Sequence, residues 1–157
     1  MTEGAWFSAL GEPLGDAERA AIAAYLSGFG MHASIGQVTS WLEAATISKQ
    51  PADAWWRAEE RERERLEKSA RLNPADPGWL ALNEKLHGAA AVAAARAGCA
   101  DAALIRAAAG AASYAAYQAR LAQAAGAASR HPFLHKYTLY CGGRWPLGVY
   151  EERFAIF

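Results

Sequence analysis

The sequence predicts an all-α fold, a single helical domain (1–157) of about six helices with a small β-hairpin over residues 144–157. Its 157 residues are one domain's worth of chain, enough for a hydrophobic core without disulfides or metals. From residue 16 onward, apolar side chains recur at helical spacing between Asp, Ser, Gly and Pro boundary signals. Residues 88–128 are more than half alanine, which has high helix propensity and little bulk, so two helices there should pack closely.

Three helices are expected in the first fifty residues. A short one over residues 2–10 would place its aromatic side chains on one side. Asp16 stands where an N-cap belongs, and residues 17–27 follow with helical spacing before a glycine stop. Ser34 or a neighbour is expected to cap the third helix, which should bury Trp41.

The clearest predicted helix covers residues 51–72, a length of about 30 Å. Arg and Glu alternate through much of residues 57–65, and no large apolar side chain occurs between Trp56 and Leu66. A helix stretch without core-facing anchors is normally solvated. The middle of this helix is therefore expected to face solvent or a partner.

Two alanine-rich helices should follow. Asp76 before Pro77 is an N-cap with a first-turn proline, and this helix should run to Gly98. Asp101 opens the second, which should end or bend near Gly126, with Gly110 as the second candidate, because an unbroken helix would exceed the width of a domain of this size.

The last helix is expected within residues 131–141, with His131 near its start and a double glycine closing it. Alternating apolar positions in this stretch also fit a strand, so the two assignments remain alternatives. Residues 144–157 then change character, with apolar runs on either side of charged residues, which predicts the hairpin.

Charge and cysteine content limit the classes of function. The net charge is zero, which argues against a nucleic-acid partner. Residues 1–50 nevertheless carry five acidic and two basic side chains, and residues 73–157 carry eight basic and five acidic ones. Cys99 and Cys141 are too few for a secreted disulfide framework, and the N-terminus lacks a signal-peptide pattern, so we expect a cytoplasmic protein that does not span a membrane.

The best candidate for a partner contact begins at Trp55 and Trp56. Neighbouring helical residues diverge by about 100°, so both indoles cannot point inward. Trp and Arg are enriched among interface hot spots, although a solvated charged helix is an equally good interpretation. With the acidic N-terminal third included, the candidate partner-binding residues are Glu12, Asp16, Glu18, Trp55, Trp56, Glu59 and Arg63.

The histidines supply the first alternative, an all-α enzyme or metal-binding protein. His131 and His135 are four residues apart and could share a helix face, with Glu84, His87 or Cys141 as further ligands. His87 with Glu84 could also form a general base and its orienting carboxylate. Capping and surface positions are the simpler interpretation, and we expect no catalytic, metal or cofactor-binding residue.

A nucleic-acid-binding regulator is the second alternative. Stacking aromatics interleaved with basic side chains are typical of single-stranded nucleic-acid surfaces. Such a mixture occurs near the C-terminus at Arg130, Lys136, Tyr137, Tyr140, Arg144 and Trp145. The neutral chain makes packing of these aromatics under the hairpin the better explanation.

One segment carries a family resemblance, and it consists of Gly143, Arg144, Trp145, Pro146, Leu147 and Gly148. With the alanine-rich helices before it, residues 82–157 resemble bacterial immunity proteins of polymorphic toxin and contact-dependent growth inhibition systems. The resemblance implies a mostly helical cytosolic protein that neutralises one cognate toxin, the C-terminal domain of a secreted or surface protein, by binding and without catalysis or cofactor. It implies a structural role for the segment and identifies no toxin-binding residue.

Overall fold

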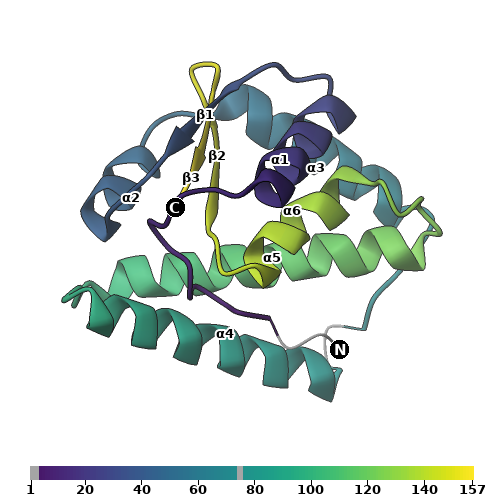
Figure 1. Ribbon diagram of the computed structural model, residues 1–157. Coiled ribbons are helices and arrows are strands. Elements are labelled where there is room, and N and C mark those ends of the chain that lie inside the picture. Colours follow the sequence, from purple (N-terminus) through teal and green to yellow (C-terminus); the bar gives the residue numbers. More distant parts are fainter. Residues whose placement is uncertain (1–3, 74–75) are drawn as a thin grey trace.

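The computed structural model describes residues 4–73 and 76–157, and within them it contains six helices and a small three-stranded sheet (Figure 1). In chain order the elements are α1 (Asp16–Gly28), β1 (Ser34–Gln37), α2 (Trp41–Ile47), α3 (Asp53–Glu67), α4 (Pro77–Arg96), α5 (Ala102–Ala124), α6 (Pro132–Cys141), β2 (Pro146–Tyr150) and β3 (Arg153–Ile156). The mostly helical prediction is confirmed.

The alanine-rich helices α4 and α5 lie antiparallel and side by side along the lower edge of Figure 1. Ala90 and Ala94 of α4 and Ala108 and Ala112 of α5 are completely buried in one apolar cluster. Small side chains let two helix backbones approach closely, so these methyl groups fill the space between the helices. On the other side, α5 contacts α6, and α6 contacts α1.

This close contact predicts the effect of larger side chains. Ala108→Leu or Ala112→Leu should destabilise the protein by about 1 to 3 kcal/mol, because added carbons must displace well-packed neighbours. Ala107→Leu is the matched control, since Ala107 is exposed on the same helix. Urea unfolding of the three variants measures the difference. If Ala108→Leu and Ala107→Leu unfold at the same urea concentration, the α4–α5 contact is not close-packed.

The sequence predicted a small C-terminal β-hairpin, and the structure contains instead a mixed three-stranded sheet that includes the two C-terminal strands. Strands β2 and β3 pair antiparallel, and Glu151 and Glu152 between them both have positive φ, of 47° and 60°, as a tight two-residue hairpin turn requires. Strand β1 adds to the other edge of β3 in parallel, with Ile35 opposite Phe154, which gives the order β1-β3-β2. The sheet is therefore mixed.

Strand β1 lies where the sequence predicted a helix capped by Ser34, and that prediction is wrong. Ser34 is the first residue of β1 and pairs with Arg153. The helix begins later, at Trp41, where the Ser40 side chain accepts a hydrogen bond of 3.1 Å from the backbone N–H of Glu43. The pairing with β3 satisfies backbone groups that a local helix would otherwise have used.

The helix predicted over residues 2–10 is also wrong for residues 4–10, which are the described part of that range. Residues 2 and 3 lie outside the described residues. Residues 6–11 form turns, and Phe7 is buried with a φ of 59°. The Ala5 N–H donates to the carbonyl of Cys141 and the Ala9 N–H to that of Gly143, at 2.8 and 3.2 Å. Contacts with the end of α6 thus replace intrahelical bonds.

The remaining helices match their predictions except in detail. Helix α1 has Gly15, not Asp16, as its N-cap, because the Gly15 N–H donates to the Glu18 carboxylate at 2.7 Å. Helix α3 ends at Glu67 and is shorter than predicted, whereas α5 ends beside Gly126, which has a φ of 72°. Helix α6 settles the helix-or-strand question for residues 131–141, with His131 as its N-cap.

Candidate functional site

The charged middle of α3 faces solvent only in part, because Arg57, Arg61, Glu64 and Arg65 are exposed as predicted whereas Glu59 is not. Glu59 is completely buried, and its carboxylate accepts hydrogen bonds of 2.7 and 2.9 Å from the Lys136 ammonium group of α6. The Tyr25 hydroxyl of α1 donates to the same carboxylate at 2.6 Å. Glu59 is therefore anchored inside the protein and cannot contact a partner, which corrects its assignment as a partner-binding residue.

The Glu59 ion pair belongs to a buried polar cluster that joins four helices. The Trp55 indole N–H donates to the Tyr25 oxygen at 2.5 Å, and the Gln118 amide of α5 donates to Glu59 at 3.4 Å. Burial and the nearby Glu59 charge raise the pKa of Tyr25, which keeps its hydroxyl protonated as a donor. Protein donors surround the carboxylate, so the cluster acts structurally by fixing α3 against α1, α5 and α6.

Four aromatic side chains line the outer side of the same contact, and we call Trp56, Tyr114, Tyr117 and Trp79 the aromatic ladder. The ring centroids of Trp56 and Tyr114 are 6.1 Å apart, and those of Tyr114 and Tyr117 are 6.3 Å apart, with both pairs stacked. Trp79 meets Tyr117 edge-on at 6.1 Å. The ladder thus runs from α3 across α5 to the first turn of α4.

Charged side chains hold the ladder in place. The Tyr114 hydroxyl donates to Glu60, and the Tyr117 hydroxyl donates to Glu67 at 2.6 Å. Arg63 bridges these two carboxylates with contacts of 2.8 and 2.6 Å. The Arg63 hydrogen bond lowers the pKa of Glu60, and the Tyr117 hydrogen bond followed by that of Arg63 lowers the pKa of Glu67. Both carboxylates consequently remain ionised and keep the phenol rings oriented.

The ladder is accessible at the surface. The Trp56 side chain is 48% exposed, and the other three rings are partly buried. The Arg120 guanidinium lies 5.1 Å from the centroid of a Trp79 ring, a cation–π distance. The result is a partly exposed aromatic surface with a mixed-charge border.

The predicted partner-binding residues divide between several environments. Trp56 and Arg63 lie in or beside the ladder, whereas Trp55 turns inward to the polar cluster. Glu12 and Asp16 are exposed on the N-terminal segment and α1. Glu18 is engaged by Arg144 at 2.6 Å.

Sequence reasoning did not select Tyr114 or Tyr117. They are three residues apart, so they share one face of α5, and two tyrosines in an otherwise alanine-rich helix were an available signal. Trp79 is partly buried against the core and partly exposed at the end of the ladder. What the sequence could not show is that α3 brings Trp56 to the same place.

The histidines considered as metal ligands or as a general base lie in different environments. The Nδ1 atom of His131 accepts the Phe133 N–H at 3.1 Å, and its Nε2 atom lies 2.7 Å from the Glu62 carboxylate. His87 and Glu84 are both exposed on α4. Across residues 4–73 and 76–157, no group of three or more His, Cys, Asp or Glu side chains has an arrangement that could hold a metal ion.

The segment from Gly143 to Gly148 closes the sheet over the helices. The Arg144 guanidinium binds the Glu18 carboxylate and donates to the carbonyls of Ala9, Glu12 and Pro13 at 2.5 to 2.8 Å. The Trp145 ring packs on Trp41, which also meets the Phe157 ring edge-on in the same buried cluster. The backbones of Trp145 and Phe157 exchange two hydrogen bonds, of 2.7 and 2.9 Å. A Cβ atom at Gly148 would lie 2.7 Å from the Trp55 ring, so glycine permits the approach of β2 to α3.

Comparisons with protein-family models, with curated proteins and with solved structures gave no significant match. Among the helices of the described residues, none combines the length and apolar character needed to cross a lipid bilayer.

Proposed function

We propose that this chain functions by binding another protein in a stoichiometric complex, with the aromatic ladder as the contact surface. The observation that carries the proposal is an accessible row of two tryptophans and two tyrosines bordered by Arg63 and Arg120. Trp, Tyr and Arg are the residue types most enriched among interface hot spots. Binding of this kind requires no catalytic group.

The fixed geometry of the ladder favours this use. Rings that are already oriented lose little conformational freedom when a partner covers them, so less binding energy is spent on ordering. Here Glu60 and Glu67 hold the two phenol groups, and the buried Glu59–Lys136 pair holds the helix that carries Trp56. The surface is thus prepared before it meets its partner.

We further propose that the partner is a bacterial toxin domain and that the chain is its immunity protein. The resemblance of Gly143–Gly148 and the alanine-rich helices to such immunity proteins supports this form of the proposal. Exposed Glu12 and Asp16, together with the negative balance of residues 1–50, would complement a basic toxin such as a nuclease.

The test begins with the gene next to the one that encodes this chain. If that gene encodes a secreted toxin, co-expression with its C-terminal domain should restore growth and yield a one-to-one complex. Trp56→Ala should weaken the complex by at least 2 kcal/mol, roughly thirtyfold in Kd, because a central aromatic anchor is lost. Isothermal titration calorimetry measures this change.

Leu42→Ala is the matched control, because Leu42 is 79% exposed on α2, away from the ladder. It should leave the Kd unchanged. Equal Kd values for Trp56→Ala and the unaltered protein would show that the ladder does not contact the partner. A neighbouring gene of metabolic function, with no toxin that binds, would contradict the immunity function.

A further inference from the structure

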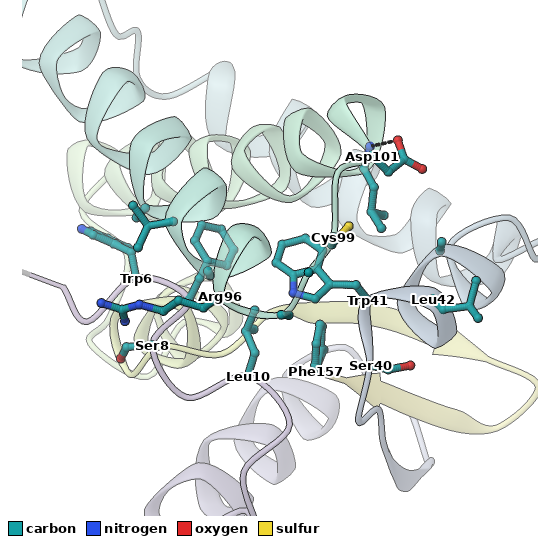
Figure 2. Close-up of a pocket in the computed structure, with 18 of the residues that line it drawn as sticks. Trp6, Ser8, Leu10, Ser40, Trp41, Leu42, Arg96, Cys99, Asp101 and Phe157 are labelled. Carbon is teal, nitrogen blue, oxygen red and sulfur yellow. Dashed lines mark hydrogen bonds between the residues drawn. The ribbon is translucent and has the colours of Figure 1, made fainter.

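A second surface feature lies at the other end of the α4–α5 pair, independent of the ladder and of the proposed function. It is a groove of about 890 Å³ between the last turns of α4, the start of α5, helix α2 and the N-terminal segment (Figure 2). Small-molecule sites commonly have volumes of about 300 to 1,000 Å³, so this groove has the size of a ligand site. We call it the α2–α4 groove.

The walls of the groove are mainly apolar. Trp41 and Phe157 are buried within it, and their rings meet edge-on at 5.7 Å. Leu42 and Val92 line it with 79% and 52% of their side chains exposed. Four large hydrophobic residues are exposed among the described residues, and two of them, Leu42 and Val92, line this one groove.

Two charged side chains of opposite sign line the groove, and the basic one, Arg96, is free to bind a ligand. Within the described residues, the Arg96 guanidinium forms no ion pair or hydrogen bond. The other charged side chain of the lining, Asp101, already accepts the N–H groups of Ala103 and Leu104, both at 3.0 Å, as the N-cap of α5. The helix dipole stabilises a basic residue in the last turn of α4, but Arg96 has no carboxylate partner among residues 4–73 and 76–157.

We propose that the α2–α4 groove binds an aliphatic monocarboxylate. The alkyl tail lies against Trp41, Leu42 and Val92, where its burial removes apolar surface of both ligand and protein from water. The carboxylate pairs with Arg96, whose planar guanidinium can donate two parallel hydrogen bonds to it. The tail supplies most of the affinity, and Arg96 supplies the preference for an anion.

Decanoate is the test ligand, and decylamine is a probe with a tail of the same length and the opposite charge. Indole N–H signals in a two-dimensional NMR titration of the full chain report where each probe binds, because Trp6 and Trp41 line the groove and Trp56 lies in the ladder. We expect decanoate to shift the Trp6 and Trp41 signals saturably and to leave Trp56 unchanged. Decylamine should bind about tenfold more weakly.

Two variants separate the charge contribution from that of the apolar wall. Arg96→Gln should reduce decanoate affinity about tenfold and remove the preference over decylamine, and Leu42→Asp should weaken decanoate through both polarity and charge. Both positions are exposed, so thermal unfolding should confirm an intact fold. The proposal is overturned if decanoate gives no saturable shift, if Trp56 shifts as strongly as Trp41, or if Arg96→Gln keeps the preference for the anion. These results leave the ladder untested, so the two proposals can fail separately.

Discussion

Lys136→Met should destabilise the protein by about 3 to 5 kcal/mol, because it leaves the completely buried Glu59 carboxylate without its counter-ion. The methionine side chain has a length similar to that of lysine, so loss of volume contributes little. Tyr25 and Gln118 still donate to Glu59, but neither carries a charge that offsets the cost of burial. Urea unfolding followed by circular dichroism measures the loss.

A double variant tests whether the missing charge is the cause. Glu59→Gln with Lys136→Met removes both charges and retains a carbonyl acceptor for the Tyr25 hydroxyl. Replacing both members of a buried pair is much less costly than removing one, so the double variant should be more stable than Lys136→Met alone. Lys68→Met is the control for lysine replacement at an exposed site. Additive effects in the double variant would show that Glu59 and Lys136 do not depend on each other.

This pair also shows where sequence-based prediction failed. In the sequence, Glu59 stands in a run of Arg and Glu that has the pattern of a solvated helix face. Its burial depends on Lys136, which lies 77 residues later and approaches only when α6 packs on α3. The sequence did not predict strand β1 for the same reason, since its partner strand Arg153–Ile156 is more than a hundred residues away. Long-range pairing leaves little trace in a local pattern.

By contrast, local sequence signals were sufficient to predict helices α4, α5 and α6 in the second half of the chain. Asp76, Asp101 and His131 each accept hydrogen bonds from the first turn of the helix that follows. The candidate site was predicted only in part. Trp56 was identified because adjacent tryptophans cannot both point inward, but the ladder required knowledge that α3 lies along α5.

Arg144→Ala should produce a loss of similar size, about 3 kcal/mol or more, by releasing the N-terminal segment. The Arg144 side chain is 4% exposed and donates to Glu18 and to three backbone carbonyls, all N-terminal to residue 19. Without it, the Glu18 carboxylate and the three carbonyls lose a charged donor. Arg144→Lys should restore only part of the loss, because an ammonium group cannot reproduce the geometry of a guanidinium. Arg19→Ala, at an exposed position of α1, is the matched control.

The same contact predicts a pH dependence. Burial by itself raises the pKa of Glu18, but hydrogen bonds from Arg144 and Gly15 and the Arg144 charge outweigh it and lower the pKa below its usual 4.5. A carboxyl with a lowered folded-state pKa stabilises the fold above its unfolded pKa, and this stabilisation is lost as the pH falls through the folded value. The stability difference between Arg144→Ala and the unaltered protein should therefore narrow as the pH falls below about 4.5 and passes through the lowered folded-state pKa of Glu18. A difference that stays constant as the pH falls through this value would mean that the carbonyl contacts, and not the Glu18 charge, account for the role of Arg144.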